Sequence, residues 1–116
     1  MKKGLIAGVS TLAFVLPGMA LADTPIKIGI LVALEGAFAA GGADGVRNVN
    51  LAIQQRGGMA GGRPVEIVVA PTDTTPDTTI RQARKLVEQD GVDFIVGPLS
   101  GSEGIAMRDF AKTVPN

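Results

Sequence analysis

Two serines on either side of a glycine are the residues of this chain best suited to contact a small molecule. Ser100, Gly101 and Ser102 follow residues 94–96, a short apolar run that is typical of a buried parallel strand. Glu103 comes next and suits the first turn of a helix, because a carboxylate is stabilised by the positive end of the helix dipole. Backbone N–H groups and hydroxyls at such a junction can bind an anion, for example a carboxylate.

A nucleophilic role is the first alternative for these serines. The hydrolase elbow has the pattern G-x-S-x-G, and around Ser102 the chain has a serine where the first glycine belongs. The chain contains no histidine that could activate a serine. We therefore predict no catalytic residue. The plain structural alternative for Ser102 is a helix cap, which is compatible with a ligand contact from the same position.

Nucleotide and metal sites are predicted to be absent. No two of the 16 glycines are separated by a single residue, which excludes the dinucleotide fingerprint G-x-G-x-x-G. Gly36 and Gly41 have phosphate-loop spacing, but Gly42 and Ala43 stand where lysine and serine or threonine should follow. The acidic side chains around residue 73 fit a polar turn with a helix cap better than a calcium loop. No cofactor is expected.

The first 22 residues have the pattern of a secretory signal peptide. Lys2 and Lys3 precede an apolar stretch, and residues 20–22 form an A-x-A cleavage site before Asp23. The apolar stretch is shorter than the roughly 20 residues of a membrane span. After cleavage the chain would carry 9 basic and 11 acidic residues and no cysteine. This balance gives no reason to expect nucleic acid or an anionic membrane surface as a partner.

Strands and helices alternate along the rest of the chain. Strands are predicted at residues 26–34, 65–70 and 94–96 from their apolar runs, and helices at 46–56, 76–90 and after Ser102 from apolar residues at helical spacing. Residues 35–45 are predicted to form an irregular loop, and residues 60–64 a turn. The order β-α-β-α-β-α implies an α/β fold with a parallel, doubly wound sheet.

The apolar positions of each predicted helix mark the side that should face the sheet. The second helix should be capped by Thr75 and end at Gly91. Its basic residues should face solvent. The expected buried residues of the second and third helices are Ile80, Ala83, Leu86, Val87, Ile105, Met107, Phe110, Ala111 and Val114.

With these residues in view, the chain resembles the start of a branched-chain amino-acid binding protein of the type I periplasmic family, the solute receptors of ABC importers. The resemblance lies in four segments, which are IKIGI at 26–30, LEGAFA at 34–39, ARKLVE at 83–88 and FIVGPLS at 94–100. It implies two α/β lobes joined by a three-stranded hinge. Residues 23–116 would then form the front part of lobe one, with the second lobe missing.

The resemblance also implies a binding site and partners. Ser100, Gly101 and Ser102 would bind the carboxylate of the solute, and Phe38 and Gly41 would border its side chain. The protein would be a periplasmic, non-catalytic receptor, monomeric when complete, that captures a small amino acid, amide or related carboxylate and delivers it to ABC permease subunits. A ligand-binding sensor domain on the same fold is the alternative, and a serine hydrolase a weaker one.

Overall fold

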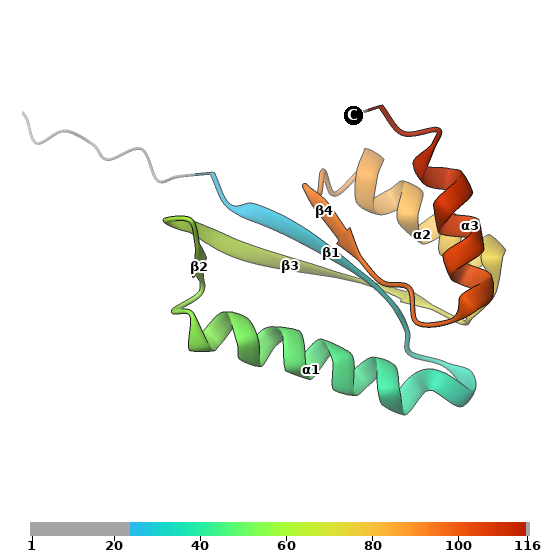
Figure 1. Ribbon diagram of the computed structural model, residues 1–116, viewed down its shortest axis with the longest axis horizontal. Helices are drawn as coiled ribbons and strands as arrows, with labels where there is room; N and C mark the ends of the chain where they lie inside the picture. Colours follow the sequence, from blue (N-terminus) through green and yellow to red (C-terminus); the bar gives the residue numbers. More distant parts are fainter. Residues whose placement is uncertain (1–23, 116) are drawn as a thin grey trace, which may run out of the picture.

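A computed structural model describes residues 24–115, and the predicted signal peptide at residues 1–22 lies outside the described residues. The described chain forms a sheet with helices on both faces (Figure 1). The strands are β1 (Ile26–Ala33), β2 (Met59–Ala60), β3 (Arg63–Thr72) and β4 (Phe94–Val96). The helices are a 3₁₀ turn η1 (Gly36–Phe38), α1 (Ala39–Gln55), α2 (Pro76–Glu88) and α3 (Gly101–Ala111).

The sheet has the strand order β2-β3-β1-β4. β1 pairs in parallel with β3 on one side and with β4 on the other, which confirms the predicted parallel α/β fold. The strand β2 was not predicted, because residues 60–64 were interpreted as a plain turn. Met59 and Ala60 instead pair antiparallel with the start of β3. The hairpin closes through Gly61 and Gly62, whose φ angles of 56° and 79° suit a two-residue turn.

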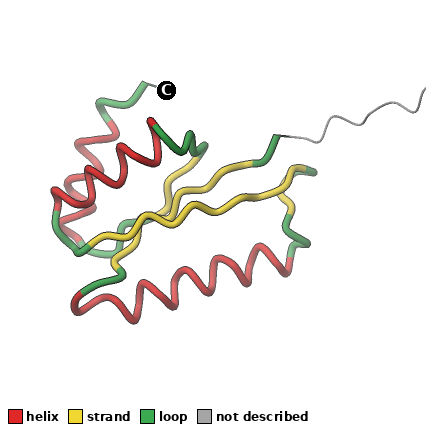
Figure 2. The backbone as a smooth tube through the Cα atoms, turned by 180° about the vertical axis from the view of Figure 1, so that it is seen from behind, coloured by secondary structure: helices red, strands yellow, loops and turns green. Residues whose placement is uncertain are grey.

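The helices form one layer on each side of the sheet. α1 runs along one face, while α2 and α3 lie together on the other (Figures 1 and 2). Most of the buried apolar side chains lie between the sheet and the α2–α3 layer, where Leu31, Ala70, Ala83, Leu86 and Phe110 form one cluster. Burial of this cluster is the main stabilising contribution on that face.

The predicted buried side of α2 is confirmed, and that of α3 is partly wrong. Ile80 and Val87 pack against the central cluster as expected, and so does Met107 of α3. Ile105, however, is 60% exposed, and Ala111 is exposed as well. The residues of α3 that face the core repeat from Glu103 through Met107 to Phe110, and a residue at position 105 falls off this line.

The prediction of an irregular loop at residues 35–45 was wrong. The chain makes the turn η1 and then enters α1 at Ala39, seven residues earlier than expected. Gly42 shows why the glycines are needed, since a Cβ atom there would lie 1.8 Å from the carbonyl oxygen of Ala33. The glycine lets the helix backbone pack directly against the end of β1.

The expectation that residues 94–96 form a fully buried strand was also wrong. β4 lies at one edge of the described sheet and pairs only with β1. Phe94 is 61% exposed and Val96 is 50% exposed. The apolar run indicated a parallel strand correctly, but it could not distinguish an edge of the described sheet from its centre.

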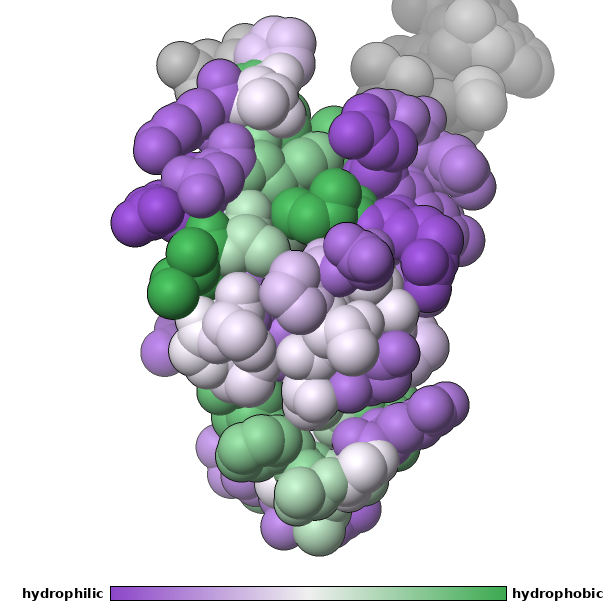
Figure 3. All heavy atoms as spheres, turned by 90° about the vertical axis from the view of Figure 1, so that its right-hand side faces the viewer, coloured by the Kyte–Doolittle hydropathy of each residue, from purple (hydrophilic) through white to green (hydrophobic). Residues whose placement is uncertain are grey.

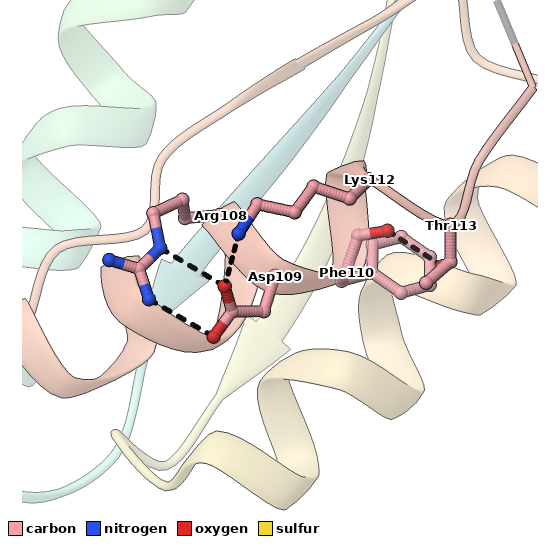
Figure 4. A network of polar contacts seen from close by, with 5 residues as sticks. All are labelled: Arg108, Asp109, Phe110, Lys112 and Thr113. Carbon is pink, nitrogen blue, oxygen red and sulfur yellow. Dashed lines mark hydrogen bonds and ion pairs between the residues drawn. The ribbon is translucent and has the colours of Figure 1, made fainter.

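The charged outer side of α3 forms its own local network (Figure 4). Asp109 accepts hydrogen bonds from Arg108 at 3.1 Å and from Lys112 at 3.0 Å. The hydrogen bond from Arg108 is the main reason that the pKa of Asp109 is lowered to about 2. All three side chains are more than half exposed, so these pairs contribute little to stability. The Thr113 hydroxyl donates to the Phe110 carbonyl at 2.7 Å, just past the end of α3.

Candidate functional site

The loops that follow β1, β3 and β4 meet at one end of the molecule. Because these strands are parallel, their carboxyl ends lie at the same edge of the sheet. We call residues 34–38, 73–75 and 97–102 together the strand-end surface. Figure 3 looks at this end, where a pale, weakly polar band lies between more hydrophobic areas. In open α/β sheets this is the end at which ligands bind.

The first turn of α3 forms a capping box at this surface. Ser100 is the N-cap, and its Oγ accepts a hydrogen bond from the backbone N–H of Glu103 at 3.4 Å. The Glu103 side chain accepts in return from the backbone N–H of Ser100 at 3.2 Å. The cap is therefore Ser100, and the alternative that Ser102 caps this helix was wrong.

Glu103 is fully buried and joins three elements. Its Oε1 accepts from the hydroxyls of Thr72 on β3 and Thr79 on α2, at 2.5 and 2.9 Å. Its Oε2 accepts from the hydroxyl of Ser100 at 2.6 Å. Burial acts to raise the pKa of Glu103, but the hydrogen bonds from Ser100, Thr72 and Thr79 outweigh it and leave the pKa below its ordinary value. Glu103 is therefore a buried carboxylate that is ionised at neutral pH.

Sequence reasoning placed Glu103 in the first turn of the helix but missed this cluster. Thr72 and Thr79 are far from Glu103 in sequence, and no local pattern connects them. One signal was present, because the serine at 100 and the glutamate at 103 form the S-x-x-E pattern of a capping box. That pattern predicts the contact between Ser100 and Glu103 but gives no information on the two threonines.

Gly101 and Ser102 are exposed at the strand-end surface, whereas Ser100 is only partly exposed. Within residues 24–115, the backbone N–H groups of Gly101 and Ser102 have no hydrogen-bond acceptor, as is usual in the first turn of a helix. The Ser102 hydroxyl makes only long contacts, 3.5 Å to the carbonyl oxygen of Thr74 and 3.3 Å to Ser100 Oγ. Two amides and one hydroxyl thus face solvent.

The other two predicted site residues lie near the end of β1. A Cβ atom on Gly41 would be 3.8 Å from the Leu99 side chain, so α1 here approaches the loop after β4. Gly41 and Leu99 both line a shallow, mostly apolar groove of about 190 Å³. Phe38 is 46% exposed and does not line this groove. The structure thus brings Gly41 together with the loop after β4 in this groove, which Phe38 does not line.

The loop after β3 is organised by Asp73. Its carboxylate accepts from the Thr75 hydroxyl at 2.6 Å, from the Thr75 N–H at 3.0 Å and from the Thr78 hydroxyl at 3.1 Å. The hydrogen bond from the Thr75 side chain is the largest reason that the pKa of Asp73 is lowered. Thr75 also caps α2, as predicted. Asp73 therefore stabilises a turn, and residues 24–115 contain no group of acidic, histidine or cysteine side chains able to hold a metal ion.

A polar groove of about 290 Å³ lies beside this turn. It extends the strand-end surface toward α2 and combines acidic, basic and hydroxyl groups. The lining residues are Glu35, Pro71, Thr72, Asp73, Thr78, Arg81 and Gln82.

Replacing Ser100 by alanine should lower the free energy of unfolding by about 1 kcal/mol, because the cap of α3 is lost. Ser102→Ala is the matched control, since Ser102 has the same side chain two residues away without a short hydrogen bond. Urea denaturation followed by circular dichroism measures both changes. An equal loss in the two variants would contradict the assignment of Ser100 as the cap.

Among residues 24–115, no helix is both long enough and apolar enough to cross a lipid bilayer. A comparison with curated proteins finds no match to this chain. A comparison with protein families matches residues 25–114 to the periplasmic binding protein family.

Solved structures with the same fold include several solute-binding proteins. An ABC transporter substrate-binding protein from Sphaerobacter thermophilus is 36% identical over 78% of this chain and 24% of its own, with a TM-score of 0.73. A solute-binding protein of an R. palustris ABC transporter, in complex with benzoate, is 26% identical over 78% of this chain and 25% of its own, with a TM-score of 0.73.

A third structure is a branched-chain amino acid transporter substrate-binding protein from Streptococcus pneumoniae, in complex with isoleucine. It is 25% identical over 78% of this chain and 26% of its own, with a TM-score of 0.70. The chain thus spans about a quarter of the length of these proteins. Its parallel strand order and its family match over residues 25–114 lead to one conclusion: the chain belongs to the periplasmic binding protein family, with the fold of part of one lobe.

Proposed function

We propose that this chain is part of an extracytoplasmic receptor that captures a small amino acid, amide or related carboxylate and delivers it to the permease of an ABC importer. The observation that carries the proposal is the strand-end surface itself. There the N–H groups of Gly101 and Ser102 and the Ser102 hydroxyl face solvent at the carboxyl end of a parallel sheet. Such groups bind a carboxylate or amide without a buried countercharge.

The ligands of two similar proteins support this choice of solute. The R. palustris protein was solved with benzoate and the S. pneumoniae protein with isoleucine. Both molecules combine a carboxylate with an apolar body. The strand-end surface offers the same combination. The residues Gly101 and Ser102, which supply the amides, are exposed, and they follow Leu99, whose apolar side chain is exposed in the same loop.

The proposed receptor works by binding rather than by catalysis. A second lobe would close over the solute, and the closed form would be the one that the permease recognises. The signal peptide predicted at residues 1–22 would bring the protein to the periplasm. No cofactor is required for any of these steps.

We expect the full-length protein to bind L-isoleucine or benzoate with micromolar affinity, and residues 23–116 alone to bind the same probe at least about 100-fold more weakly. The reason is that the strand-end surface is open and supplies contacts from one side only, whereas ligand sites usually enclose most of the ligand. Isothermal titration calorimetry measures both affinities. Equal affinity for the two proteins would contradict a site between two lobes. If the full-length protein binds neither probe nor any amide or amino acid in a thermal-shift screen, the proposed solute class is wrong.

A further inference from the structure

The hydroxyl of Ser100 cannot donate to Glu103 and to a solute at the same time. A serine hydroxyl has one hydrogen to donate, and that of Ser100 is directed to Glu103 Oε2 at 2.6 Å. The Ser100 oxygen accepts from the Glu103 N–H as well. The Ser100 N–H also points to Oε2, at 3.2 Å. Both donors of Ser100 are therefore taken by a side chain that is fully buried.

The carboxylate of Glu103 is held on its other side by threonine hydroxyls. Thr72 donates to Oε1 at 2.5 Å. Thr79 also contacts Oε1 at 2.9 Å, but its single hydrogen is shared with the Thr75 carbonyl at 2.8 Å. The firm donors to Glu103 are thus Thr72 on β3 and Ser100 at the start of α3. Together they fix the loop after β4 relative to the loop after β3.

We propose that Glu103 is a positioning residue for solute binding, which occupies both donors of Ser100 and thereby leaves the Ser102 hydroxyl and the amides of Gly101 and Ser102 as the groups that contact the solute. This inference rests on the proposed receptor function. It divides the two serines into a structural one, Ser100, and a ligand-binding one, Ser102.

The first test needs no solute. Amide hydrogen exchange in the unliganded full-length protein should show slower exchange at Ser100 N–H than at Gly101 and Ser102 N–H. In Glu103→Ala the Ser100 amide should lose this protection. Equal exchange at the three amides of the unsubstituted protein would overturn the role of Glu103, even if neither L-isoleucine nor benzoate binds and the proposed solute class fails.

The second test uses whichever of L-isoleucine and benzoate binds the full-length protein. Ser102→Ala should raise the Kd about tenfold without lowering the Tm, because a hydrogen bond to the solute is lost. Ser100→Ala should lower the Tm and leave the Kd unchanged, because the Ser100 N–H still bonds to Glu103. A rise in Kd for Ser100→Ala as large as that for Ser102→Ala would overturn the proposal.

Glu103 variants separate positioning from a purely structural role. At a temperature where all variants are folded, Glu103→Ala should raise the Kd about tenfold, since the loop is no longer held. Glu103→Gln keeps an oxygen and a nitrogen in place and should restore most of the affinity. A Glu103→Ala variant with a lowered Tm and an unchanged Kd would show that Glu103 serves the fold alone, and would overturn the proposal.

Discussion

Gly42→Ala should lower the free energy of unfolding by about 3 kcal/mol, because the added methyl group would overlap the backbone at the end of β1. The added Cβ would lie 1.8 Å from the Ala33 carbonyl oxygen and 3.0 Å from a methyl carbon of Val32. The carbonyl belongs to the last residue of β1 and cannot move without disturbing the sheet. α1 would have to shift away from β1, together with the groove beside it.

Gly45→Ala provides the matched control. It lies one turn further along the same helix, and a Cβ there would meet no atom within 4 Å. Alanine is a better helix former than glycine, so this variant should be more stable by about 0.5–1 kcal/mol. Urea denaturation of the two variants beside the parent protein measures the difference. Equal stabilities of Gly42→Ala and Gly45→Ala would show that α1 does not pack on β1 as described.

Glu103→Ala should lower the free energy of unfolding by about 3 kcal/mol at pH 7, because it leaves the buried hydroxyls of Thr72 and Thr79 and the partly buried hydroxyl of Ser100 without their charged acceptor. The stability should also change with pH. The pKa of Glu103 in the folded protein is lower than the ordinary value of 4.5. Its contribution is therefore complete above the unfolded pKa and is lost as the pH falls through the lower, folded pKa.

The pH dependence can be assigned to Glu103 by comparison. Urea denaturation between pH 7 and pH 3 should show a shallower loss of stability for Glu103→Gln than for the parent protein. Asp73 and Asp109 also have lowered pKa values, so Asp109→Asn is a useful control on the solvent-exposed side of α3. A Glu103→Gln variant with the same pH profile as the parent protein would contradict an ionised Glu103 in the folded state.

Local features of the sequence determined which segments form helices and strands and where most of them end. Thr75 and Pro76 mark the start of α2 through bonds within one turn, and Gly57 marks the end of α1 through its positive φ of 69°. The alternation of strands and helices was sufficient to predict a parallel sheet. It also placed Ser100, Gly101 and Ser102 at the carboxyl end of a strand, because that position follows from chain order alone.

Contacts between distant segments decided the rest. Residues 36–45 have the glycine-rich composition of a loop, yet α1 begins at Ala39, and glycine at position 42 lets this helix pack against Ala33, where a Cβ atom would not fit. The S-x-x-E pattern connects Ser100 to Glu103 within one turn, but only the fold brings Thr72 and Thr79 to the other oxygen of Glu103 and buries its carboxylate. The spacing of residue types along the chain depends on local backbone geometry and can be interpreted from the sequence. Burial and hydrogen-bond partners depend on which elements pack together.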